Sequence, residues 1–337
     1  MKNRCAFLNA QHEFTIEERE IPVPKDDEVL IQIVANGICG SDIHFYAEGR
    51  LGNFVVTKPY IPGHEASGIV AGVGKEVTDF KEGERVAIEP GIPCDRCSYC
   101  KSGRYNLCPS VVFLSAPPIN GTFCDFICVR SDFVHKIPGD MPFEHAALIE
   151  PAAVAVHAVN RAGNINGKGC AIFGAGPIGL LTLQAFKAAG GGNTICIDML
   201  DNRLELAKTL GADEVINVND GRDLTDIADI IFETAGSPSA TAQLFTAARA
   251  GGTVVQVGWP AGNVVTMNIA DFIEKELDYV SVNRYANAYP AAIRYICDGR
   301  IRVEPLITQT YSFEEIQEAF KFAKENAKEV IKIVVKN

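Results

Sequence analysis

The sequence predicts an α/β protein with two domains, one rich in short β-strands and one built on a doubly wound parallel sheet. With 337 residues, the chain is long enough for two hydrophobic cores. Short β-like runs broken by Gly and Pro fill the first 150 residues, and from about residue 153 strands alternate with helix-length segments. This alternation is typical of a parallel sheet covered by helices.

Each expected element follows from its own pattern. In the first half the β-like runs are EVLIQIVANG (28–37), SGIVAGVG (67–74) and ERVAIEPG (84–91). In the second half the strands GCAIFGAG (169–176), NTICIDML (193–200) and EVINV (214–218) alternate with helix-length PIGLLTLQAFKAAG (177–190) and NRLELAKTLGAD (202–213). Two later strands, DIIFETAG (229–236) and GTVVQVGW (252–259), extend the sheet, and helix-like FEEIQEAFKFAKENA (313–327) precedes a last strand, VIKIVVK (330–336).

A glycine-rich turn joins the first strand of the second half to its first helix. The turn reads Gly174-Ala175-Gly176-Pro177-Ile178-Gly179. In a dinucleotide-binding turn, the first glycine permits the tight bend, the second lets the backbone approach a pyrophosphate, and the third allows close helix packing. The alternative is an ordinary strand-to-helix turn, but the flanking strand and helix favour a dinucleotide site of the Rossmann type.

An acidic residue follows at the end of the next predicted strand. Asp198 lies nineteen residues beyond Gly179, where its carboxylate can accept hydrogen bonds from the adenosine ribose and repel a 2′-phosphate. NAD is therefore expected rather than NADP, and we place Arg203 in the same cofactor site. The alternative for Asp198 is a carboxylate that caps the following helix.

Four cysteines, Cys94, Cys97, Cys100 and Cys108, lie within fifteen residues. Four thiolates at such spacing suit a closed, tetrahedral zinc site. Disulfides are the alternative, but the N-terminus shows no secretory signal, and clustered cysteines in a reducing cytosol favour metal. Ferredoxin iron–sulfur clusters use other spacings. A second, scattered set of candidate ligands comprises Cys39, His64, Glu65 and Glu150.

Composition excludes two classes of partner. The formal net charge is −11, and no block of Lys and Arg offers a surface for nucleic acid or for an anionic membrane. The sequence contains no uninterrupted run of eighteen apolar residues, the length that suggests a membrane-spanning helix. We expect a cytoplasmic enzyme whose partner is a small molecule.

The chain resembles the zinc-containing medium-chain dehydrogenases over essentially its full length, and among them it looks most like the sorbitol (polyol, L-iditol 2-) dehydrogenases. The motifs that carry the resemblance are GICGSDIHFY (37–46), PGHEASGIV (62–70), EPG (89–91), CKSGRYNLCPS (100–110), ALIEP (147–151) and NRYANAYP (283–290). The resemblance implies a GroES-like catalytic domain formed by residues 1–152 and 284–337, and a Rossmann NAD-binding domain formed by residues 153–283.

The resemblance also implies an open, catalytic zinc site. Cys39 matches the family's thiolate ligand and His64 its imidazole ligand, whereas in isolation each would be a buried thiol or a core histidine. Glu65 and Glu150 both match acidic positions near the metal, and the sequence does not decide which one binds it. With the four-cysteine lobe complete, two zinc ions per subunit are expected. Losing the structural one should destabilise its lobe without directly stopping hydride transfer.

Further family positions concern the proton and the substrate. Ser41 and His44 match a proton relay, for which a histidine that titrates near neutrality is suited. Asp42 is expected to orient a zinc-binding imidazole, with a turn-forming role as the alternative. Arg284 and Tyr285 match positions that contact substrate hydroxyls, and Phe113 matches an aromatic position of the substrate pocket. Phe45 and Ala116 depart from the mammalian polyol enzyme, so the exact polyol is left open.

The expected reaction is transfer of a hydride from a secondary hydroxyl of sorbitol, xylitol or a related polyol to NAD⁺, giving a ketose. The alternatives are the same mechanism on another secondary alcohol, such as butanediol or threonine, and a non-catalytic dinucleotide-binding protein. A homo-oligomer is expected, with a tetramer favoured over a dimer. The remaining cysteines are expected to be buried and inert: Cys5, Cys124, Cys128, Cys170, Cys196 and Cys297.

Overall fold

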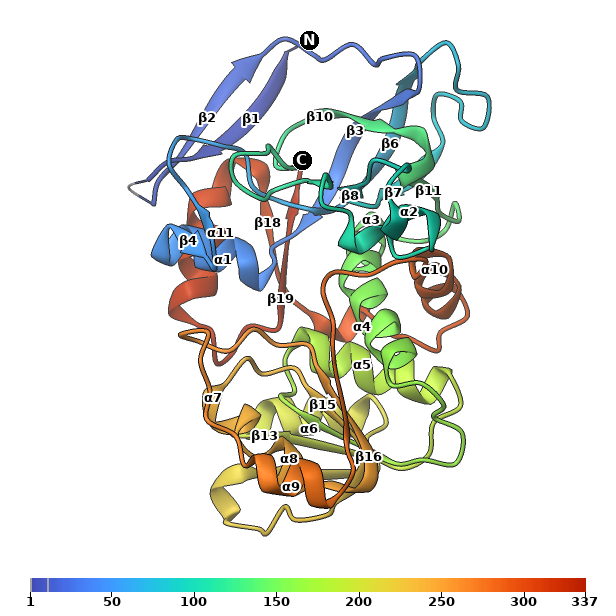
Figure 1. The fold of residues 1–337 in the computed structure, drawn as a ribbon. Helices are drawn as coiled ribbons and strands as arrows, with labels where there is room; N and C mark the ends of the chain where they lie inside the picture. Colours follow the sequence, from blue (N-terminus) through green and yellow to red (C-terminus); the bar gives the residue numbers. More distant parts are fainter. Residues whose placement is uncertain (1, 11) are drawn as a thin grey trace. The chain divides into compact units, whose positions relative to one another are not determined.

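The computed structural model describes residues 2–10 and 12–337, which pack into two compact units (Figure 1). The first contains the chain up to Glu150 together with Leu306–Asn337, and the second contains Pro151–Pro305. Residues 284–305, expected with the first domain, therefore pack with the second unit. One reason is local: the backbone N–H of Arg302 donates to Oε1 of Gln184 at 2.7 Å, and both residues belong to the second unit.

The first unit is built on a seven-stranded sheet in which neighbouring strands run antiparallel, except for the parallel pair at its C-terminal edge. The strand order is β11-β7-β6-β3-β19-β18, and β10 also pairs with β3. The bounds are β3 Glu28–Gly37, β6 Glu65–Val73, β7 Arg85–Ile88, β10 Phe126–Arg130, β11 Val134–Lys136, β18 Ile307–Ser312 and β19 Lys332–Lys336. The predicted β-rich half is confirmed.

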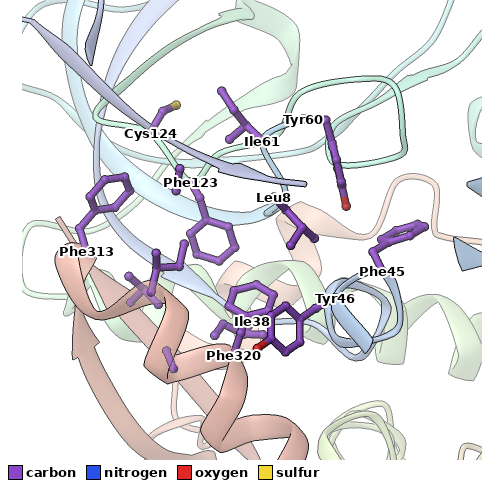
Figure 2. Packing of buried hydrophobic residues seen from close by; sticks show 14 of the residues in the cluster. Leu8, Ile38, Phe45, Tyr46, Tyr60, Ile61, Phe123, Cys124, Phe313 and Phe320 are labelled. Atoms are coloured by element: carbon purple, nitrogen blue, oxygen red, sulfur yellow. The ribbon is translucent and has the colours of Figure 1, made fainter. Parts of the chain in front are cut away.

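Smaller elements surround this sheet. Three two-stranded ladders pair β1 Asn3–Leu8 with β2 Phe14–Arg19, β4 Arg50–Leu51 with β5 Phe54–Val55, and β8 Gly91–Ile92 with β9 Val112–Phe113. The helices are α1 Gly40–Glu48, α2 Ser98–Lys101, α3 Phe143–Ala147 and α11 Ile316–Glu325, and α4 Ile149–Arg161 crosses the boundary to the second unit. Figure 2 shows a core of this unit, where aromatic side chains from α1 and α11 pack with Leu8 of β1 and with Phe123.

The second unit contains the predicted parallel sheet. Its six strands lie in the order β14-β13-β12-β15-β16-β17, which is the doubly wound order of dinucleotide-binding domains. The strands are β12 Cys170–Phe173, β13 Thr194–Asp198, β14 Glu214–Asn217, β15 Ala228–Glu233, β16 Ala248–Gln256 and β17 Asp278–Ser281. The helices are α5 Pro177–Ala188, α6 Asp201–Thr209, α7 Pro238–Thr241, α8 Leu244–Ala247, α9 Ile269–Glu274 and α10 Tyr289–Cys297.

The central strand of this sheet explains where the cofactor turn lies. All four residues of β12 are buried and apolar, as expected of a strand covered by helices on both faces. The glycine-rich turn follows β12 and Asp198 ends β13, and because these strands pair in parallel, both lie at the same edge of the sheet. The predicted α/β fold is confirmed. Among the helices that the structure describes, none combines the length and the apolar character that crossing a bilayer requires.

One expectation about the cysteines was wrong. Cys297 ends α10 and is exposed, since the last turn of this amphipathic helix leaves its final residue at the surface. Cys128 is half-buried, whereas the other four additional cysteines are buried as expected.

Candidate metal centres and cofactor site

The structure groups three of the four scattered ligand candidates. Three residues of the first unit, Cys39, His64 and Glu65, each offer one ligand atom. These three atoms lie within 4.8 Å of one another. Cys39 is the residue that precedes α1, and Glu65 begins β6, so a helix start and a strand start meet at this point. Among the residues that the structure describes, Glu150 does not join this group at that distance, although it is buried.

The imidazole of His64 lies in an anionic environment. Oδ1 of Asp42 lies 3.7 Å from Nδ1 of His64, which is an ion-pair distance rather than a hydrogen bond. Burial lowers the pKa of His64, but Asp42 and Cys39 outweigh burial and raise this pKa well above its usual value. Within residues 2–10 and 12–337, the buried Nδ1 has no hydrogen-bond partner. The site therefore favours a positive charge beside the ring, either a proton or a metal ion.

Asp42 is held in place by its own hydrogen bonds. It is fully buried, and its carboxylate accepts hydrogen bonds from the hydroxyl of Ser115 at 2.8 Å and from the backbone N–H of Cys39 at 3.1 Å. The contact with Ser115 was not predicted, because 73 residues separate the two positions. Its location next to His64 agrees with the expected orienting role.

Glu65 has a buried partner that sequence reasoning missed. The ammonium group of Lys332, in β19, donates to both carboxylate oxygens of Glu65, at 2.7 and 2.9 Å. Burial lowers the pKa of Lys332, but Glu65 and Cys39 raise it, leaving this pKa above its usual value. A lysine within the apolar run VIKIVVK was the available signal, since a charged residue is buried in a strand only when it is paired.

The two relay candidates occupy different environments on α1. Ser41 is half-buried in the first turn, two residues after Cys39. His44 is exposed, with Nδ1 3.1 Å from a carboxylate oxygen of Glu48. The imidazole of His44 is therefore accessible to solvent, five residues after Cys39.

Aromatic residues divide between the metal group and the core. The ring of Phe113 lies 5.6 Å from the ring of His64, so it walls the metal group, as expected of a substrate-side residue. Phe45 instead points into the core, where it meets Tyr60 edge to face at 6.1 Å (Figure 2). The difference from the mammalian polyol enzyme at this position therefore affects the packing of the core. Ala116 is half-buried and follows Ser115.

The second metal group is the four-cysteine cluster. The ligand atoms of Cys94, Cys97, Cys100 and Cys108 lie within 4.8 Å of one another, and all four are free thiols. The sulfurs of Cys97 and Cys100 are 3.3 Å apart, across the start of α2. Backbone N–H groups of Arg96 and Cys97 lower the pKa of Cys94 to about 6, which favours its thiolate, whereas burial and the neighbouring thiols raise the pKa of Cys100 to about 12.

The glycine-rich turn has the geometry that a dinucleotide requires. Gly174 has a φ of 98°, in the left-handed region that favours glycine. A Cβ on Gly179 would lie 1.8 Å from the carbonyl oxygen of Gly174, so the helix can approach the turn only at a glycine. Gly176 precedes α5 with Pro177 at its first position, an arrangement that leaves backbone N–H groups for an anion.

A cavity of about 470 Å³ lies beside this turn within the second unit. Asp198 is in its wall, where its carboxylate accepts hydrogen bonds from the backbone N–H groups of Ala175, Met199 and Leu200 at 2.7 to 3.0 Å. The carboxylate is therefore held rigidly at the edge of the cavity. The lining residues with expected roles are Gly174, Gly176, Pro177, Asp198 and Arg203; Ile178 is half-buried next to them.

A buried carboxylate at the end of β15 supports the loop opposite the turn, and sequence reasoning missed it. Glu233 accepts hydrogen bonds from the backbone N–H of Ala235 at 3.1 Å and from the side chain of Gln256 at 2.8 Å. Burial raises the pKa of Glu233 despite these bonds. The loop that Glu233 holds contributes Thr234 and Ala235 to the cavity wall.

Arg284 and Tyr285 lie in the second unit, between β17 and α10. Arg284 has a φ of 56°, a conformation that costs a non-glycine residue free energy and that is enriched at functional sites. Tyr285 is buried, with its ring 5.6 Å from that of Tyr289.

Two family models match this chain. The alcohol dehydrogenase GroES-like domain matches residues 25–139, and the zinc-binding dehydrogenase domain matches residues 177–297. Sorbitol dehydrogenase of Bacillus subtilis is 42% identical over 98% of this chain and 96% of its own length. The chain belongs to the zinc-containing medium-chain dehydrogenases.

Two further similarities concern proteins named for sugar-derived substrates. D-xylulose reductase of Saccharomyces cerevisiae is 38% identical over 97% of this chain and 96% of its own length. The crystal structure of L-idonate 5-dehydrogenase from Escherichia coli covers 100% of this chain and 99% of its own, with a TM-score of 0.94 and 31% identity. As a family member, this chain is an oxidoreductase with zinc and NAD(H) as its cofactors.

Proposed function

We propose that the protein oxidises a secondary hydroxyl of a polyol, such as sorbitol or xylitol, to a ketose, with NAD⁺ as the hydride acceptor. The observation that carries this proposal is the group formed by Cys39, His64 and Glu65. A thiolate, an imidazole and a carboxylate leave a fourth position of a tetrahedral metal open for substrate. The likeness to proteins named sorbitol dehydrogenase and D-xylulose reductase supports a polyol as substrate.

The residues fit a zinc ion. The three donors are of the types that zinc prefers, and their ligand atoms lie within 4.8 Å of one another. Bound there, zinc would supply a Lewis acid that polarises the reacting oxygen. We assign Glu65 as the carboxylate ligand and Glu150 as a further negative charge beside the ion. The four-cysteine cluster would hold a second, structural zinc.

The chain's own side chains serve the proton, the substrate and the cofactor. Ser41 and exposed His44 form the route by which the proton of the hydroxyl reaches solvent, and Glu48 holds the imidazole of His44. Arg284 and Tyr285 bind the other hydroxyls of the polyol.

The cofactor residues form one set in the second unit. Asp198 accepts hydrogen bonds from the adenosine ribose and disfavours NADP, while Arg203 forms part of the same wall. The pyrophosphate binds at the start of α5, on the backbone of the turn from Gly174 to Gly179.

We also propose a cytoplasmic homo-oligomer, a tetramer rather than a dimer, whose only other partner is the small-molecule substrate. Cys5, Cys124, Cys170 and Cys196 are buried free thiols, which suits a reducing compartment. The domain boundaries proposed from the resemblance, 1–152 with 284–337 and 153–283, differ from the packing units mainly in residues 284–305.

The test is NADH formation with a panel of sorbitol, xylitol, ribitol, galactitol, idonate, 2,3-butanediol, threonine and 2-propanol, before and after chelation and with zinc restored. Zinc-restored turnover confined to polyols is expected. Turnover only on butanediol or threonine would move the substrate to the alternative class. Bound NAD⁺ without turnover on any panel member would favour the non-catalytic alternative.

A further inference from the structure

The ammonium group of Lys332 is the feature of the metal group that no ligand role explains. Lys332 is 3% exposed, and its Nζ donates at 2.7 and 2.9 Å to the two oxygens of Glu65 and at 3.0 Å to the carbonyl oxygen of Ile38. These three bonds use all three protons of the ammonium group. Such a buried cation is retained only when it is fully paired.

The sheet is built to hold this pair. In the β3–β6 register Gly37 lies directly opposite Glu65, and a Cβ on Gly37 would lie 2.0 Å from Oε2 of Glu65. The carboxylate therefore lies over a position that only glycine leaves open. On the other side of β3, β19 pairs Val334 with Gly37 and brings Lys332 to the same place. Three strands fix the carboxylate and the ammonium group together.

The charges around Lys332 show what the cation balances. The thiol of Cys39 and the carboxylates of Glu65 and Glu150 all interact electrostatically with Lys332. With Cys39 as a thiolate and His64 neutral, as metal binding requires, these groups carry three negative charges against two positive charges on zinc. Lys332 supplies the positive charge that balances these three groups and the ion, while Asp42, beside His64, adds a further negative charge to the site.

We propose that Lys332 is a positioning residue that competes with zinc for Glu65 and weakens zinc binding at the open site. This inference rests on the proposed assignment of Cys39, His64 and Glu65 as zinc ligands. The same carboxylate oxygens face an ammonium group whether or not the ion is bound, so Glu65 gives zinc less of its charge. Less of the positive charge of zinc is therefore neutralised at the position of the substrate, and zinc binds the protein less tightly.

The consequence is opposite to that of an ordinary structural lysine. In Lys332→Met, the protein without zinc contains an unpaired buried carboxylate, and zinc binding neutralises that carboxylate. Zinc binding should therefore be tighter in the variant, with the dissociation constant of the open site lowered at least about tenfold. Loss of a purely structural contact would weaken zinc binding or leave it unchanged.

The experiment measures zinc per chain by mass spectrometry after equilibration with chelators of graded zinc affinity, for wild type, Lys332→Met and Lys336→Met. Lys336 is the matched control: it lies on the same strand and pairs with Glu144 at the surface, so its loss changes net charge equally. Cys39→Ser marks which zinc belongs to the open site. Tighter binding in Lys332→Met alone is expected, and equal or weaker binding would overturn the inference.

A second comparison keeps the test decisive if Lys332→Met does not fold. Glu65→Gln and the double variant Glu65→Gln/Lys332→Met both lack the one carboxylate for which Lys332 and zinc are proposed to compete, so their zinc dissociation constants should agree within about threefold. A larger difference would overturn the inference. Wild-type protein with one zinc per chain and no loss in Cys39→Ser would instead refute the proposed open site itself, so the two failures are distinguishable.

Discussion

Two glycines of the cofactor turn, Gly176 and Gly179, are predicted to respond differently to the same substitution. In Gly176→Ala, the nearest atom to the new Cβ is Nη1 of Arg203, at an ordinary 3.9 Å, and the φ of −76° suits alanine. In Gly179→Ala, the new Cβ lies 1.8 Å from the carbonyl oxygen of Gly174, so helix α5 must retreat by about 1.6 Å to reach ordinary contact.

These distances set the expected magnitudes. Overpacking at Gly179 should lower the free energy of unfolding by about 1–3 kcal/mol. Alanine at Gly176 should change it by less than about 0.5 kcal/mol, because nothing in the folded protein has to move. It should nevertheless keep the pyrophosphate from the backbone, and the loss of one or two charge-assisted hydrogen bonds would raise the NAD⁺ dissociation constant roughly tenfold to a hundredfold.

Urea unfolding and NADH fluorescence titration measure the two quantities separately. Gly176→Ala should be as stable as wild type but bind the cofactor poorly, whereas Gly179→Ala should be less stable than wild type. Wild-type cofactor affinity in Gly176→Ala would refute the placement of the pyrophosphate. Wild-type stability in Gly179→Ala would refute the close approach of α5 to the turn.

Three further predictions concern the second metal group, cofactor choice and pH. Cys97→Ser should remove one zinc per chain and lower the melting temperature by about 5 °C or more, with NAD⁺ affinity unchanged within about twofold; an unchanged zinc content by mass spectrometry would contradict this. Asp198→Asn keeps an acceptor for the backbone N–H groups but loses the charge, so the ratio of kcat/KM for NAD⁺ over NADP⁺ should fall at least about tenfold; an unaltered ratio would exclude Asp198 as the selecting residue. Burial and Arg161 lower the pKa of His157 to about 4, below the usual 6.5, so the unfolded chain binds the proton more tightly and stability falls as pH drops from about 6.5 to 4. Because the ring is half-buried, wild type should lose about 1 kcal/mol more than His157→Gln over this range in urea titrations; parallel pH profiles would argue against the burial of a neutral ring.

Local patterns in the sequence were sufficient for much of the architecture. The four-cysteine cluster spans fifteen residues, so its spacing alone brings the sulfurs together. The glycine-rich turn is bounded by a buried strand and an apolar helix, and Asp198 ends the adjacent parallel strand. In each case the residues of the site are close in the chain or lie on successive strands, so their spacing in the sequence is enough to predict that they meet.

Contacts between distant segments were not predictable from such patterns. Lys332 and Glu65 are 267 residues apart, and only the placement of β19 beside β3 brings them together. The support of Asp42 by Ser115 depends on a loop conformation that composition does not specify. Phe45 was identified only as a departure from the mammalian polyol enzyme, and its burial in the core was not predicted. Motif resemblance identifies a position, whereas packing decides which way its side chain faces.

The most direct test of the central claim follows the hydrogen itself. Sorbitol, or the best polyol of the panel, would be labelled with deuterium at the secondary carbon C2 and oxidised with NAD⁺, and the mass of the reduced cofactor would be measured. Transfer of the label to the cofactor, with a ketose as product, is the predicted result. Unlabelled cofactor with an aldose as product would show that a primary hydroxyl reacts, and would contradict the account.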